Sequence, residues 1–80
     1  MLSELKTAKK VVGVKQLRKA LTNGTALRVF LAEDADPQLT DPLRALSEAQ
    51  GIPVVGDVTM EALGIACGIS VRAAAAAVVA

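Results

Sequence analysis

The residues best suited to chemistry in this 80-residue chain are cations that follow a glycine. Lys15, Arg18 and Lys19 fall in the first turns of a helix expected after Gly13. A helix start prefers acidic residues, because its free N–H groups and dipole already make that end positive. Lys15 also repels Arg18 and Lys19, from which it is separated by i,i+3 and i,i+4 spacing. A bound anion, most commonly phosphate, would relieve both effects. The alternative is a solvated face, because Lys and Arg are good helix formers.

A second candidate site consists of three carboxylates, Glu33, Asp34 and Asp36, that directly follow an apolar run. Ligands bind at the carboxyl ends of strands in open α/β sheets, and clustered carboxylates there can hold Mg²⁺. Asp and Pro are also ordinary turn and capping residues, and we favour that interpretation. A Mg²⁺-dependent site stays a lesser alternative.

The chain lacks the residues that most other catalytic and metal sites require. The chain has no histidine, which excludes Ser-His and Cys-His nucleophiles. One thiol without imidazole cannot form a zinc site, and no phosphate-binding glycine motif occurs. Cys67 is expected to be a small core residue rather than a reactive thiol. We therefore expect a non-catalytic protein without a cofactor or metal.

The charge is unevenly distributed, although the net charge is only +1. Residues 1–28 contain seven of the nine cations and one acid, a net charge of +6. Residues 29–80 contain two cations and seven acids, a net charge of −5. Such asymmetry indicates a polyanionic partner for one side of the molecule.

Composition narrows the class of protein further. The chain is 52% hydrophobic, but Phe30 is its one aromatic residue, which excludes a base-stacking binder of single strands. A single cysteine favours a reducing, cytoplasmic setting. No apolar segment is long enough to span a bilayer. We expect one cytoplasmic domain over residues 1–80, monomeric and not associated with membranes.

Patterns of apolar residues, caps and glycines predict alternating helices and short strands, typical of an α/β layered domain. The first helix is expected from Ser3 to about Lys10, and the second from Gly13 to a stop at Asn23-Gly24. A third helix is expected to have Asp41 as its cap and Pro42 as its first residue, and to end at Gly51. A fourth is expected from Thr59 to Gly68. Strands are expected at residues 11–14, 27–32 and 52–55. Propensity alone favours a helix for the alanine-rich tail, residues 73–80, although Val78-Val79 favour a strand.

The loop Ile69-Ser70-Val71-Arg72 after Gly68 presents two apolar side chains and a cation. Such a loop can cover an exposed base while Arg72 reaches a phosphate. An ordinary connection between two elements is an equally good explanation.

With these motifs in view, the chain resembles the L7Ae family of kink-turn RNA-binding ribosomal proteins, most closely its short bacterial members. The likeness covers nearly the whole chain. Archaeal and eukaryotic members usually carry Asn-Glu where this chain and the short bacterial members carry Lys15-Gln16. The motifs, in order, are Gly13-x-Lys15-Gln16-x-x-Lys19, Ala32-Glu33-Asp34-Ala35-Asp36-Pro37 and Leu63-Gly64-x-Ala66-Cys67-Gly68-Ile69-x-Val71-x-Ala73-Ala74-Ala75.

This resemblance implies a three-layer α/β/α sandwich around a four-stranded mixed sheet, in which residues 74–79 form a strand. It also implies binding to kink-turns, internal loops in which tandem sheared G·A pairs bend an RNA helix sharply. By matching position, the basic helix would enter the widened major groove, and the loop would pack over an extruded nucleotide. The residues expected against the guanine edges are Gly13, Val14, Lys15, Gln16 and Lys19. Those expected to contact phosphate or to form the covering loop are Lys9, Lys10, Arg18, Arg28, Ile69, Ser70, Val71 and Arg72.

We therefore predict a non-catalytic protein that recognises kink-turns in structured, possibly ribosomal, RNA and stabilises their bent form. The main alternative is a small protein-interaction or regulatory domain whose basic face docks an acidic partner.

Overall fold

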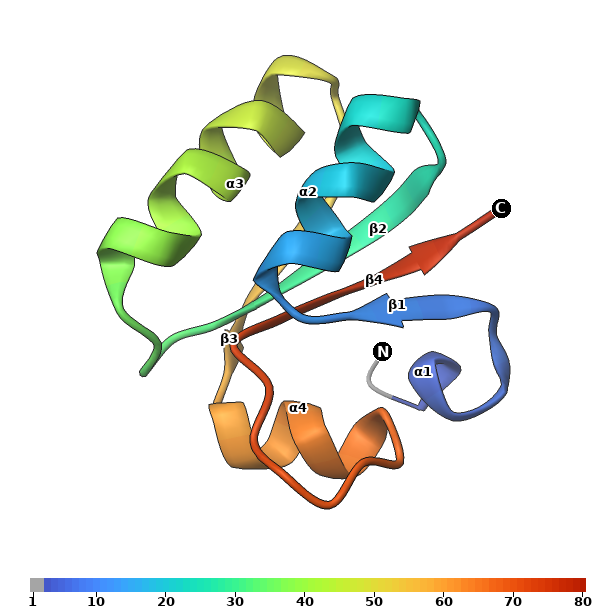
Figure 1. The fold of residues 1–80 in the computed structure, drawn as a ribbon, viewed down its shortest axis with the longest axis vertical. Helices are drawn as coiled ribbons and strands as arrows, with labels where there is room; N and C mark the ends of the chain where they lie inside the picture. Colours follow the sequence, from blue (N-terminus) through green and yellow to red (C-terminus); the bar gives the residue numbers. More distant parts are fainter. Residues whose placement is uncertain (1–2) are drawn as a thin grey trace.

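The centre of the fold is a four-stranded mixed sheet, seen in the computed structural model, which describes residues 3–80 (Figure 1). The strand order is β1-β4-β2-β3. β4 runs antiparallel to both β1 and β2, whereas β2 and β3 are parallel. The mixed four-stranded sheet predicted from the resemblance is therefore confirmed. The strands are β1 (Lys10–Val12), β2 (Ala26–Ala32), β3 (Val54–Val58) and β4 (Ala75–Val79).

Helices cover both faces of this sheet and complete the three layers predicted from the resemblance (Figure 1). One face packs against α1 (Glu4–Thr7) and α4 (Met60–Ala66), and the other against α2 (Val14–Asn23) and α3 (Pro37–Ala49). Each face has its own core. The first is centred on Leu5, Phe30 and Leu63, and the second on Leu17, Leu21 and Leu43.

The alanine-rich tail is the strand β4, so the helix favoured by propensity alone is wrong. β4 lies between two other strands, and Ala76 pairs with Val12 on one side and Phe30 on the other. Hydrogen bonding along both edges outweighs the modest helix preference of alanine. Ala75, Ala76 and Ala77 are fully buried, and their small side chains leave room for the helices above and below.

Helix α3 begins earlier than the sequence predicted. Asp36 is its N-cap and accepts a hydrogen bond at Oδ1 from the N–H of Gln38, at 2.9 Å. The prediction of Asp41 as cap and Pro42 as first residue was wrong, because Asp36-Pro37 supplies the same pattern five residues sooner. Pro42 lies inside the helix, where it cannot donate to the carbonyl of Gln38; that residue is exposed, so water can replace the donor.

Other boundaries also differ from the prediction. β1 covers residues 10–12 rather than 11–14, and β3 continues to Val58 rather than ending at Val55. α1 ends at Thr7 rather than near Lys10, because Ala8 is extended and Lys10 belongs to β1. β3 starts two residues later than expected, after Pro53, whose carbonyl accepts a hydrogen bond from the N–H of Val29. None of the helices within residues 3–80 combines the length and apolar character needed to cross a bilayer.

The revised start of α3 can be tested by comparing Asp36→Ala with Asp41→Ala. Loss of the cap should lower the free energy of unfolding by about 0.5–2 kcal/mol in the first variant. Asp41 is exposed within the helix and should cost clearly less. Urea denaturation of both variants measures the difference. A larger loss for Asp41→Ala would contradict the assigned cap.

Candidate functional site

Several connections between strands and helices meet at one end of the sheet. There the N–H of Gly13 donates to the carbonyl of Ala75, at 2.8 Å, and the N–H of Ala32 donates to the carbonyl of Ala74, at 2.9 Å. The first bond joins the start of α2 to the first residue of β4, and the second joins the end of β2 to the end of the α4–β4 loop, which we define as residues 67–74. Figure 1 shows the start of α2 beside the start of β4. The basic helix and the predicted covering loop therefore reach the same end of the molecule.

The start of α2 has no side-chain cap and no acidic residue in its first turn. Its N-cap is Gly13, with φ 105° and ψ 155°, a conformation that L side chains rarely adopt. By contrast, Asp36 caps α3, and Thr59 caps α4 through the N–H of Ala62. The first-turn N–H groups of α2 are thus left for a partner from outside.

Four polar side chains at this helix start, those of Lys15, Gln16, Arg18 and Lys19, are exposed. Leu17 and Leu21 anchor the opposite side of α2 in the core. Within residues 3–80, the one ion pair joins Arg28 to Glu4, so Lys15 and Lys19 have no carboxylate partner in the part of the chain described. The cations remain available to a ligand.

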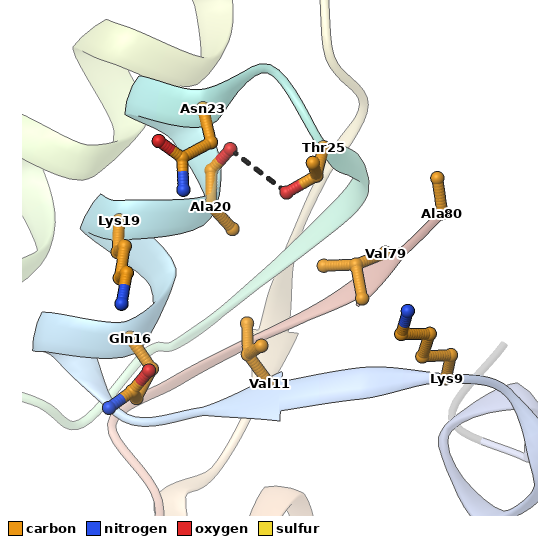
Figure 2. A pocket seen from close by; sticks show the side chains of 9 residues that line it. All are labelled: Lys9, Val11, Gln16, Lys19, Ala20, Asn23, Thr25, Val79 and Ala80. Carbon is orange, nitrogen blue, oxygen red and sulfur yellow. Dashed lines mark hydrogen bonds between the residues drawn. The ribbon is translucent and has the colours of Figure 1, made fainter.

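A shallow pocket of about 240 Å³ lies between α2 and β1. Figure 2 shows Gln16, Lys19 and Asn23 along the side of α2 that faces it, with Lys9 and Val11 opposite. Asn23 and Thr25 were not predicted as site residues, although Asn23 follows Gln16 and Lys19 at helical spacing. No carboxylate side chain is among its described lining residues, which suits an anionic ligand. The residues that line the pocket are Lys9, Val11, Gln16, Lys19, Ala20, Asn23, Thr25, Val79 and Ala80.

Two of the predicted phosphate contacts, Lys10 and Arg28, lie on the other face of the sheet. Val12 and Phe30, each two residues further along the same strands, pack in the core beside α1 and α4. Arg28 Nη1 donates to Glu4 Oε1 at 2.8 Å. Period-two alternation along a strand therefore separates both cations from α2. The structure does not bring them together with Lys9, Lys15 and Lys19.

Cys67 is buried, as the sequence predicted for a small core residue. Burial raises the pKa of its thiol, and the nearby positive charge of Lys10 partly opposes this shift. A thiol with a raised pKa is mostly protonated at neutral pH, so it is a poor nucleophile.

The α4–β4 loop presents the side chains that the sequence identified. Ile69, Ser70, Val71 and Arg72 are exposed, and Val71 is 68% accessible. An exposed valine of this kind offers an apolar surface without a partner in the described residues.

Two of the three carboxylates after β2, Asp34 and Asp36, have structural roles in this fold. Asp34 Oδ1 accepts a hydrogen bond from the N–H of Met60 at 2.8 Å, and Asp36 caps α3. The turn and capping interpretation is therefore confirmed for both residues. Residues 3–80 contain no group of three side chains suited to hold a metal ion.

Comparison with known proteins gives a consistent family. The family model for the ribosomal protein L7Ae/L30e/S12e/Gadd45 family matches residues 2–80. An RNA-binding protein of Geobacillus sp. (strain WCH70) is 44% identical over 75 residues, which cover 94% of this chain and 92% of that protein. Large ribosomal subunit protein eL8 of Halobacterium salinarum is 44% identical over 69 residues, which cover 85% of this chain and 58% of that protein.

A solved structure has the same fold. The Giardia lamblia 15.5kD RNA binding protein superimposes with a TM-score of 0.89 at 30% sequence identity, covering 99% of this chain and 70% of that one.

The unfavourable charge at the start of α2 predicts a gain in stability when it is reversed. Lys15→Glu should raise the free energy of unfolding of the free protein by about 1 kcal/mol at low salt, because an acid suits the helix start and attracts Arg18 and Lys19. Lys15→Gln should give a smaller gain. Urea denaturation at low and high salt is the measurement, and the gain should shrink as salt screens it. An unchanged or lower stability for Lys15→Glu would contradict this account of the helix start.

Proposed function

The chain belongs to the ribosomal protein L7Ae/L30e/S12e/Gadd45 family, and from this premise we propose that it is a non-catalytic RNA-binding protein that recognises kink-turns. Relatives named as RNA-binding proteins match it over most of their length. A target in ribosomal RNA is one form of this proposal, supported by the similarity to eL8.

One observation carries the proposal: the start of α2 is cationic, exposed and uncapped, and it lies beside the α4–β4 loop. A lone folded domain gains nothing from cations at that position. An RNA phosphate or a base acceptor placed there would pair with free N–H groups and with lysine ammonium groups at once.

Two features of α2 support the proposal of kink-turn recognition: it is a helix, and its exposed side chains can bind guanine edges. The major groove of regular A-form RNA is too narrow for side chains to read, so a helix needs RNA whose own bend opens the groove. Lys15 and Lys19 can donate to guanine O6 and N7, which are both acceptors. Gln16 can donate and accept. Gly13 has no side chain, so it allows the backbone to approach closely at the helix start.

The remaining contacts divide between phosphates and the extruded nucleotide. Lys9, Arg18 and Arg72 are the phosphate ligands that we propose. Ile69 and Val71 would cover the extruded base, and Ser70 lies between them. We leave out Lys10 and Arg28, because both lie on the α1 and α4 side of the sheet and Arg28 is paired with Glu4.

The protein would hold RNA in the bent form without any chemical step. A ligand that binds the kinked state better than the extended state shifts the equilibrium by the difference in affinity. The expected role is therefore to stabilise the kink.

This function is tested by titrating a kink-turn duplex and a matched duplex without its G·A pairs, each at two salt concentrations. Binding should be clearly tighter to the kink-turn at both concentrations, while the shared phosphate contribution weakens as salt rises. Fluorescence anisotropy or calorimetry measures both affinities. Equal affinity for the two duplexes would reduce the protein to a polycation, and no affinity for either would favour a protein partner instead.

Lys19→Ala tests direct reading of a guanine. The variant should lose about 1–3 kcal/mol of binding free energy on the kink-turn and much less on plain duplex. Lys6→Ala is the matched control, because Lys6 is an exposed lysine of α1 on the opposite layer. The same loss on both RNAs would make Lys19 a phosphate contact.

A further inference from the structure

We propose that Gly64, in the middle of α4, is the residue that positions the α4–β4 loop against the extruded nucleotide. The inference rests on the proposed function, because it assigns to that loop a contact with RNA. Gly64 is buried, so it is a positioning residue that would itself touch no RNA.

The loop is attached to α4 by backbone hydrogen bonds. The N–H of Ile69 donates to the carbonyl of Gly64, and the N–H of Ala73 donates to the carbonyl of Met60, each at 3.1 Å. Gly68, with φ 75°, makes the turn from which the chain runs back along the helix. The helix therefore fixes both ends of the segment that carries Val71 and Arg72.

The middle of the segment rests directly on Gly64. A Cβ built on this glycine would overlap the carbonyl oxygen of Val71 and would come within 3.2 Å of the Arg72 Cα. Both neighbours are backbone atoms, so a side chain at residue 64 can be accommodated only if the loop backbone moves away. Gly56 differs, because a Cβ there would meet the end of the flexible Arg44 side chain, at 3.2 Å.

Glycine is a poor choice at this position for the helix alone. Alanine is the better helix former, so Gly64→Ala would stabilise an α4 that had no loop against it. Contact with the loop reverses this expectation. Gly64 thus allows the Val71 and Arg72 backbone to lie close to α4, with both side chains exposed at the end of the sheet where α2 begins.

The test compares wild type, Gly64→Ala and the matched control Gly56→Ala on two RNAs. One is the intact kink-turn duplex, and the other is the same duplex with an abasic site in place of the extruded nucleotide. Wild type and Gly56→Ala should bind the intact RNA about tenfold more tightly than the abasic RNA. Gly64→Ala should bind the intact RNA about tenfold more weakly than wild type and should no longer distinguish the two RNAs.

Amide hydrogen exchange supplies a readout that a loss of global stability would not reproduce. In Gly64→Ala, the amides of Ile69 and Ala73 should exchange faster while those of the β4 core keep their protection. A variant with one glycine inserted between Ser70 and Val71 leaves α4 intact and should also lose discrimination against the abasic RNA.

The inference is overturned if Gly64→Ala keeps wild-type discrimination, if its loop amides stay protected, or if the inserted glycine leaves discrimination unchanged. It is also overturned if Gly64→Ala does not fold, because the whole fold would then require the glycine. If wild type binds the kink-turn but ignores the abasic change, the inference fails while the proposed function stands. If wild type does not distinguish the kink-turn from plain duplex, the proposed function itself fails.

Discussion

The hydrogen bonding of β4 along both of its edges is the constraint on which the site depends. β4 pairs with β1 and β2, and its first residue, Ala75, also accepts the N–H of Gly13 through its carbonyl. A strand paired on both sides cannot shift its register without breaking two ladders. The start of α2 and the end of the α4–β4 loop are therefore held at a fixed separation, although sixty residues of chain lie between them.

The alanines of β4 explain how two helical layers fit around so short a sheet. Ala76 faces the core beneath α1 and α4, whereas Ala75 and Ala77 face α2 and α3. Larger side chains in these fully buried positions would overpack the core and force the helices outward. The same small residues made the segment ambiguous in sequence, because alanine has no strong strand preference of its own.

The sequence predicted several elements correctly from local signals, although it placed the start of α3 at the second of two Asp-Pro pairs. Gly13 at the start of α2, Asn23-Gly24 at its end and the apolar run of β2 all predicted elements that the fold contains. The sequence did not predict the features that depend on contacts between residues far apart in the chain. The strand state of the tail follows from pairing with β1 and β2, and the ion pair between Arg28 and Glu4 joins residues 24 positions apart. For the site, helical spacing was enough to group the cations on α2. The side of the sheet on which Lys10 lies could be assigned only once the register of β1 was known.

Burial of its inner face lets α2 keep an unfavourable start in the free protein. Leu17 and Leu21 are almost completely buried, and each such side chain contributes about 1.5–3 kcal/mol. The misplaced cations and missing cap cost less than this, since each unfavourable charge is worth about 0.3–1 kcal/mol. The helix is therefore formed before any ligand arrives. An anion that binds there gains the free N–H groups and the lysines without having to order the backbone, and so loses less of its interaction energy to conformational entropy.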